Sequence, residues 1–444
     1  MLAACRTGGE GCAMPTFALV PSDVEGCMEE LWELQSAFHD CFARSEPRAH
    51  VFDSMVGQCR TLERKAIEPM ALHVEGGPIR GMQRLISAVR GDEAQMRWNS
   101  HQRVADELGD TEGGLMCDET GFVKKGKDAV GVARQYWGTL GKVENCQVGV
   151  FAVYASRHGY ALVDKRLFLP EAWWTDASAA RRTRGNVPET LTLQSKPQLA
   201  AAMWQTMAQE GRRSFTSVVA ECLYGNSPDC LAAVDAGVGV TTGVAIASET
   251  RGWLQRPQTA DRGYPYQGEA RSKRVVVGPE HAPRTVAALA ANLPASCGYQ
   301  RKVSEGSKGP IGYAFARQGV TLWTEGLPER TVWLVIKRRV GTDPGYSSVI
   351  SHALASTPWR TLVWRSGGRW ASEHCFAEGK TELGRAHYAV RQYPGWHPHM
   401  RTTMWAPCFL WHLKLHVGKK SPRPHRVAAA DGLGRRLPPG DVDH

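Results

Sequence analysis

The chain has 444 residues, of which 42% are hydrophobic and 22% charged, so it can bury a large core and form two or three domains. Its net charge of +10 and pI of about 9.1 suit a protein that binds nucleic acid, but many basic proteins merely have cationic surfaces, and charge carries no information about fold. The sequence lacks a membrane-length apolar run, a signal peptide pattern and cysteine pairs at zinc-motif spacing, so we expect a cytoplasmic protein with reduced thiols.

The first part of the chain predicts helices. Ser22 and Glu25 form a capping-box pattern at the start of the first helix. Apolar residues at helical spacing predict three further helices, over 51–62, 79–89 and 92–108. Several arginines lie in this region, and two interpretations remain open for them. They indicate either a domain that binds DNA ends or the solvated face of a helical bundle.

Strand patterns dominate after Gly114. Two strand-like runs, 147–155 and 160–169, predict an antiparallel meander with the strand that starts near Gly114. A crossover helix over 197–209 then leads to a strand that ends at Glu221. A helix over 228–236 and a strand over 238–246 complete a mixed sheet with flanking helices.

An acid, Asp118, ends a short apolar run, and three lysines follow it closely: Lys124, Lys125 and Lys127. This pattern predicts a carboxylate at a strand end that points toward solvent, where a divalent cation could join it to a phosphate. Most acids at strand ends only cap a turn, and most lysine clusters are solvated. The interpretation therefore depends on further carboxylates.

Two more acids lie in comparable contexts. Glu221 directly follows the apolar run 217–220, and a Gly- and Pro-containing turn comes next. Arg369, Glu373, Phe376 and Lys380 follow one another in steps of four, three and four, so they share one face of a predicted helix. That face presents an acid flanked by two cations.

The interval between Glu221 and Glu373 is too long for one loop in a compact domain. Strand-like runs between 251 and 349 predict a β-rich insertion there. Its tryptophans, Trp253, Trp323 and Trp333, suit either core packing or stacking on an unpaired base.

These acids and their surroundings resemble the DDE transposases of bacterial insertion sequences, most closely insertion sequence family seven-zero-one with its DDE-superfamily endonuclease domain. The resemblance runs from about Phe38 to about Lys420. Long segments carry it in order: GFVKKGKDAVGVARQYWGTLGKVENCQVGVFAVYAS after the first acid, VDKRLFLPEAWWTD further on, LYGNSPDCLAAVDAGVGVTT after the second, and RW, GKTELG and HYAVRQYPGW around the third.

The resemblance implies an α/β fold with an RNase H-like mixed-sheet core, in which Asp118, Glu221 and Glu373 form a catalytic triad that binds Mg²⁺ or Mn²⁺. It implies cleavage and strand transfer of double-stranded DNA at terminal inverted repeats, by at least a dimer in the bacterial nucleoid. Related family-four insertion sequences have an Arg and a Lys at the offsets of Arg369 and Lys380 from the acid. These two residues and the three lysines after Asp118 are therefore expected to bind DNA phosphates.

The expected organisation has five parts. They are a helical DNA-end-binding domain at 20–110, the first part of the core at 111–250, the β-rich insertion at 251–349, the C-terminal helices of the core at 350–418 and a basic disordered tail at 419–444.

The chain departs from the family pattern at four positions. Glu221 stands where the family has Asp, Ser372 where a residue is usually apolar, Ala386 where Asp is usual, and Ser366 where the family-four pattern opens with tyrosine. Two hypotheses follow. The chain is either an active transposase or a catalytically impaired relative that binds DNA and acts as a repressor.

Overall fold

A computed structural model describes residues 21–416 of the chain with internal gaps. The gaps are 75–78, 88–90, 139–140, 211–214, 226, 236–240, 268, 279–281, 293–298, 307–308, 340–345, 352–356 and 368. The expected disordered tail, 419–444, lies outside the described residues.

The chain divides into two compact units, and neither is one continuous segment. Within the described residues, unit 1 contains Glu112–Met116 and Phe215–Arg369. Unit 2 contains the remainder, from α1 to Thr111, Cys117–Ser214 and the segment from Trp370 onward. Strand β1 (Gly114–Val123) begins in unit 1 and continues in unit 2.

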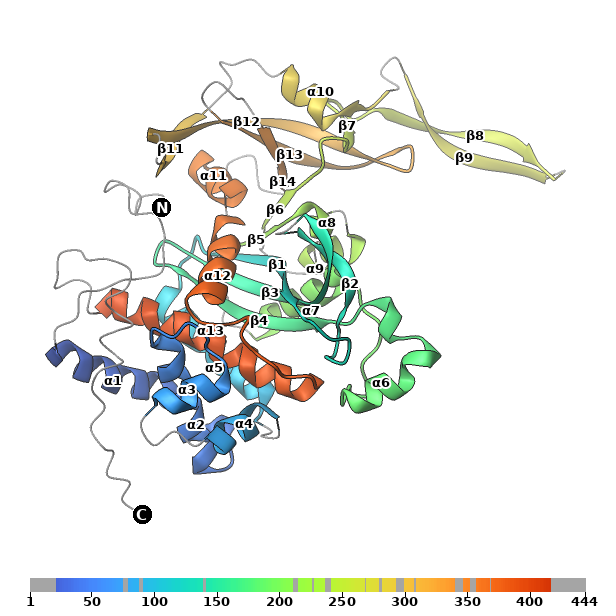
Figure 1. Cartoon of the computed structure of the whole chain (residues 1–444). Coiled ribbons are helices and arrows are strands. Elements are labelled where there is room, and N and C mark those ends of the chain that lie inside the picture. Colours follow the sequence, from blue (N-terminus) through green and yellow to red (C-terminus); the bar gives the residue numbers. More distant parts are fainter. Residues whose placement is uncertain are drawn as a thin grey trace. The chain divides into compact units, whose positions relative to one another are not determined.

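Unit 2 contains most of the helices (Figure 1). Its N-terminal helices are α1 (Pro21–Ser36), η2 (His39–Cys41), α2 (Ser45–Cys59), α3 (Ile67–His73), α4 (Ile79–Ser87) and α5 (Glu93–Leu108). Its later helices are η4 (Glu171–Trp173), η5 (Asp176–Ser178), α6 (Ala179–Arg184), α7 (Lys196–Gln209), α12 (Arg369–Thr381) and α13 (Tyr393–His416). The four helices predicted before residue 110 are all present. The structure adds α3, whose seven residues are too few for a clear periodic signal.

The main core of unit 2 joins the first of the described helices to the last of them, α13. Leu31 and Phe38 are buried together with Trp405 and Phe409 of α13. The rings of Phe38 and Trp405 stack with their centroids 3.8 Å apart. Asp92 caps α5 by accepting a hydrogen bond from the Gln95 N–H at 2.9 Å. The N-terminal helices therefore share one core with α13.

The sheet of unit 2 has the order β1-β3-β2, in which β2 pairs with residues 142–146 of β3. Strand β4 pairs with residues 148–155 of β3. Its strands besides β1 are β2 (Ala133–Trp137), β3 (Lys142–Ala155) and β4 (Tyr160–Phe168). The predicted antiparallel pairing of β3 with β4 is confirmed. Strand β2 was not predicted. Gly141 has a positive φ of 62°, which glycine adopts without strain, and the chain turns there so that Trp137 pairs with Lys142.

Unit 1 contains a longer sheet in the order β10-β7-β12-β13-β14-β6-β5-β1, with β11 paired to β12. Its strands are β5 (Ser217–Ala220), β6 (Thr241–Ala245), β7 (Arg251–Trp253), β10 (Arg284–Thr285), β11 (Tyr299–Gly306), β12 (Gly309–Thr324), β13 (Leu327–Arg339) and β14 (Tyr346–Ser351). Its helices are α8 (Cys222–Gly225), α9 (Pro228–Asp235), α10 (Val286–Ala291) and α11 (Trp359–Gly367). Strands β8 (Gln258–Tyr266) and β9 (Glu269–Val277) form a separate two-stranded sheet.

The predicted α/β fold with an RNase H-like mixed sheet is confirmed. In unit 2, β3 lies between β1 and β4, and its pairing with β4 is antiparallel. In unit 1, β5 lies between β1 and β6, and β5 and β6 run parallel from the Ser217–Thr241 pair to the Ala220–Val244 pair. Strands also dominate the segment between residues 251 and 351.

The cysteines that the structure describes have free thiols. A helix of the length and hydrophobicity needed to span a bilayer does not occur among the described helices.

Candidate active site

Asp118 lies in the middle of β1 and is only 8% exposed. The prediction that Asp118 ends its strand and points toward solvent was therefore wrong. The strand continues because Thr120 and Phe122, beyond the acid, are themselves buried, and Phe122 packs edge-to-face against Phe151 of β3 at 6.4 Å. The pattern of apolar residues alone could not show this, because the polar Glu119 and Thr120 interrupt it.

Hydrogen bonds hold both carboxylate oxygens of Asp118. Oδ1 accepts the backbone N–H of Glu119 at 2.8 Å, and Oδ2 accepts the hydroxyl of Ser372 at 3.0 Å. Ser372 is 1% exposed and lies on α12. Its hydroxyl therefore links β1 to the helix at the residue directly before Glu373. In the sequence, Ser372 differs from the family pattern as a polar residue at a position that is usually apolar. That difference was the only signal of its contact with Asp118.

Helix α12 is present where the spacing of Arg369, Glu373, Phe376 and Lys380 predicted it. Glu373 is exposed, whereas Phe376 is buried against Phe151, with ring centroids 5.6 Å apart. Lys380 is half-buried, and its Nζ lies 5.6 Å from the centroid of the Phe122 ring. Burial, aided by the nearby Arg385 charge, lowers the pKa of Lys380 to about 8. The structure does not describe the side chain of Arg369.

Glu221 follows β5 directly and precedes α8, so it lies at the strand end that the sequence predicted. It is half-buried, and its carbonyl accepts the backbone N–H of Tyr224 at 3.0 Å. Glu221 belongs to unit 1, whereas Asp118 and Glu373 belong to unit 2. Within the residues that the structure describes, no three His, Cys, Asp or Glu side chains gather closely enough to hold a metal ion. The contact that the structure does show is therefore that of Asp118 with α12.

The three lysines after β1 differ in their surroundings. Lys124 donates to the Tyr388 carbonyl at 2.9 Å, and its Nζ lies 3.3 Å from the centroid of the Tyr388 ring. Burial lowers the pKa of Lys124 to about 7. Lys125 and Lys127 are exposed. Asn145 fixes this loop, because its amide donates to the Lys124 carbonyl at 2.5 Å. Of the three predicted phosphate-binding lysines, only Lys125 and Lys127 face solvent.

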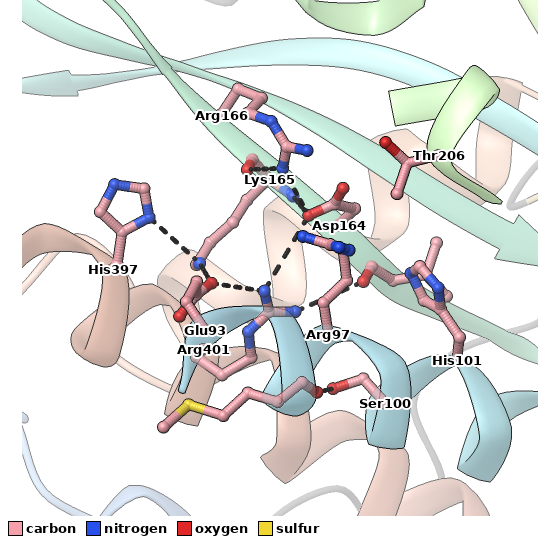
Figure 2. A network of polar contacts seen from close by, with 12 residues as sticks. Glu93, Arg97, Ser100, His101, Asp164, Lys165, Arg166, Thr206, His397 and Arg401 are labelled. Atoms are coloured by element: carbon pink, nitrogen blue, oxygen red, sulfur yellow. Dashed lines mark hydrogen bonds and ion pairs between the residues drawn. The ribbon is translucent and has the colours of Figure 1, made fainter. Parts of the chain in front are cut away.

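A separate polar cluster in unit 2 lies between β4, α5 and α13, and sequence analysis did not find it (Figure 2). Lys165 is 0% exposed and pairs with Glu93, whose carboxylate also contacts Arg401 Nη2 at 2.5 Å. Asp164 is likewise fully buried, and its Oδ1 accepts from Arg166 Nη1 at 2.8 Å. Cations therefore already contact one carboxylate oxygen of each of these two acids.

Electrostatics in this cluster favour ionised acids. Burial alone would raise the pKa of Asp164, but the charges of Arg166 and Arg401 outweigh it and hold that pKa below its usual range. Lys165 and Arg401 have the same effect on the half-buried Glu93, whose pKa is also well below normal. His397 Nδ1 lies 3.4 Å from Lys165 Nζ, and burial lowers the pKa of His397 to about 3, so this imidazole is neutral.

Comparisons with known proteins give a family match and one structural neighbour. Residues 37–310 match the family model described as "DDE superfamily endonuclease". A search of curated proteins found no match. Among solved structures, one similar chain comes from a cryo-EM structure of a piggyBac transposase synaptic complex with hairpin DNA. It has 9% identity and a TM-score of 0.44, and the alignment covers 93% of this chain and 79% of that one.

Proposed function

The chain belongs to the family of DDE superfamily endonucleases, and from this membership we propose that it is a transposase of insertion sequence family seven-zero-one. In this proposal it binds the terminal inverted repeats of an insertion sequence, cuts the DNA strands at their ends and joins them to target DNA. The contact between Asp118 and Ser372 is the observation that supports it best. It brings the first acid of the expected triad to the helix that carries the third.

The chemistry of the donor set fits a divalent cation such as Mg²⁺ or Mn²⁺. Asp118, Glu221 and Glu373 would supply carboxylate oxygens, which are the ligands that Mg²⁺ prefers. A bound cation of this kind activates the attacking oxygen and stabilises the leaving oxygen in an in-line displacement. In the chain itself, the Ser372 hydroxyl and the Glu119 N–H fix the orientation of the Asp118 carboxylate.

Cations near the acids would hold the DNA backbone. Lys380 lies on the same helix as Glu373, and Lys125 and Lys127 are exposed in the loop after β1. Contacts of this kind position DNA without reading its sequence, and they weaken as salt rises. Pairing two element ends requires two active sites, so we propose at least a homodimer on double-stranded DNA, in the nucleoid of a bacterial cell.

Cleavage of a labelled duplex that contains an element end and its flanking DNA tests this function. We expect strand cleavage at the element boundary with Mg²⁺ or Mn²⁺, and none when EDTA replaces the metal. A scrambled boundary sequence serves as the matched substrate control. Binding without cleavage in either metal would contradict the proposed enzyme.

The pKa of Lys380 predicts a pH effect on DNA binding. A phosphate beside the lysine favours its charged form, so binding takes up a proton once the pH exceeds the unbound pKa of about 8. Affinity should therefore be constant below about pH 7 and fall by up to about tenfold per pH unit as the pH rises through 8. Fluorescence anisotropy at fixed ionic strength measures this. Lys380→Gln should remove this fall in affinity with rising pH. An unchanged fall would show that another group titrates.

A second candidate function rests on Glu221, which replaces the family's usual Asp and adds a methylene to the ligand. In that function the chain binds repeat sequences without cutting and acts as a repressor. Glu221→Asp distinguishes the two. An impaired wild type should gain cleavage in this variant, whereas an active wild type should already cut with Glu221 in place. Cleavage by neither protein would reject the catalytic assignment altogether.

A further inference from the structure

Strands β8 and β9 form a two-stranded ribbon in unit 1 whose two faces differ in charge (Figure 1, yellow-green). Every residue of β8 is exposed, from Gln258 to Tyr266. A two-stranded hairpin in water has marginal stability by itself, because neither face is covered. The exposed side chains of such a ribbon therefore indicate which partner it binds rather than how it folds.

The register assigns each side chain to a face. Directly paired residues of antiparallel strands point to the same side, and successive residues alternate. Arg262 pairs with Lys273, and Tyr264 pairs with Arg271 two residues further along. Tyr266 follows on the same side. The five residues Arg262, Tyr264, Tyr266, Arg271 and Lys273 define the cationic face, and Glu269, which pairs with Tyr266, is an acid on the same side.

The opposite face has balanced charges. There Asp261 pairs with Arg274, and their side chains form an ion pair at 3.3 Å. Gly263 and Pro265 continue this face of β8 toward the turn, and neither carries a charge. We call it the neutral face. The two faces thus share one backbone but differ in their charge patterns.

The cationic face contains a pair that folding does not explain. Arg262 and Lys273 are directly opposite each other, and like charges in that position destabilise a strand pair. Glu269 near the turn contacts Arg271 at 3.5 Å, but both side chains are more than half exposed, so that ion pair offsets little. A polyanion on this face would remove the repulsion between Arg262 and Lys273.

We propose that the cationic face of the β8–β9 ribbon docks on duplex DNA, with Arg262, Arg271 and Lys273 on phosphates and the tyrosines along the groove. This rests on the proposed function, because DNA is the polyanion that such an enzyme handles. A two-stranded ribbon has the width that the major groove admits. Tyr264 and Tyr266 are 42% and 46% exposed, and their hydroxyls can donate to phosphate or base edges. A lipid surface fits less well, since membrane-binding elements need an apolar face.

Two variants on neighbouring residues test the docking face. Lys273→Gln removes one charge from the cationic face, and Arg274→Gln removes one from the neutral face of the same strand. Both change the net charge equally, so long-range attraction to DNA falls equally. We expect Lys273→Gln to weaken binding by up to about tenfold near 0.1 M salt and to reduce the salt slope by about one, as the loss of one phosphate contact predicts. Arg274→Gln should leave that slope unchanged.

Binding is measured by anisotropy of the full-length protein on a short labelled duplex of mixed sequence, with EDTA present so that no cleavage occurs. Circular dichroism checks folding; Lys273→Gln should not lower thermal stability, because it removes a like-charge pair. Equal slopes for both variants, or a larger loss for Arg274→Gln, would overturn the docking face. So would a wild type that binds anionic vesicles but no duplex.

The same proteins, with Mg²⁺ added and a duplex that contains an element end, separate this inference from the proposed function. Binding with the predicted slope difference but without cleavage would reject the proposed enzyme and keep the docking face. Cleavage by the wild type with identical salt slopes for Lys273→Gln and Arg274→Gln would keep the proposed enzyme and reject the docking face.

Discussion

An Asp118→Asn variant should lose at least about a thousandfold in its rate of DNA cleavage while binding DNA nearly as well as the wild type. The amide keeps the shape of the side chain and can still accept the Ser372 hydroxyl, but it removes the negative charge that a cation requires. Metal assistance contributes several kcal/mol to such a displacement, and each 1.4 kcal/mol is about tenfold in rate. Single-turnover cleavage in Mg²⁺, measured beside anisotropy in EDTA, separates the two effects.

Helix α12 carries both a second acid of the proposed triad, Glu373, and an acid outside it, Glu378, which serves as a matched control. Glu373→Gln should reduce cleavage as strongly as Asp118→Asn. Glu378→Gln removes the same charge from the same helix, but Glu378 accepts a hydrogen bond from the Tyr160 hydroxyl at 2.9 Å and is outside the proposed triad, so cleavage should change little. Ser372→Ala should cost about 10–100-fold, which is the usual effect of releasing a ligand from its supporting contact. Wild-type rates in Asp118→Asn would refute the assigned triad.

The second large effect concerns stability. Glu93→Gln should lower the free energy of unfolding by about 2–4 kcal/mol, because it leaves the buried cations Lys165 and Arg401 with only Asp164 to oppose them (Figure 2). The lower part of this range allows for the 37% exposure of the Glu93 side chain, where water partly replaces the lost charge. Chemical denaturation at pH 7 measures the difference. A double variant with Glu93→Gln and Lys165→Met should recover part of the lost stability, since the second substitution removes the buried ammonium that has lost Glu93 as its partner.

The pH dependence of this difference identifies its cause. The pKa of Glu93 in the folded protein is held far below the ordinary value of 4.5, so its stabilising effect is complete above about pH 5 and decreases as the pH falls below 4.5. Wild type and Glu93→Gln should therefore converge in acid. Glu144→Gln, which removes an acid from an exposed pair with Lys142, should have no measurable effect on stability. A difference that does not depend on pH would assign the loss to packing instead.

Local sequence patterns predicted the helices and strands of this fold better than they predicted the surroundings of individual side chains. The helices of the N-terminal part and the strands β3 and β4 follow from periodicity. The position of Glu221 after β5 followed from the same kind of pattern. These signals extend over a few residues, so a single sequence is enough to read them.

Environments formed by distant segments could not be read in this way. The burial of Asp118 depends on Ser372, which lies 254 positions later in the chain. No local pattern distinguishes Lys165, because its partners Glu93 and Arg401 come from two other elements. Lys124 was grouped with Lys125 and Lys127, although its contact with Tyr388 distinguishes it. Which charges face inward is a property of the folded chain that residue spacing does not encode.

The core that α13 completes has a consequence during synthesis. Leu31, Phe38 and their neighbours gain their apolar partners Trp405 and Phe409 only when α13 has left the ribosome. Until then, the earliest helices of the nascent chain expose surface that chaperones recognise. A message that is cut short by a frameshift or an early stop codon would thus yield a fragment with an unfinished core, exposed to proteolysis. Only a chain that is translated through α13 can complete this core.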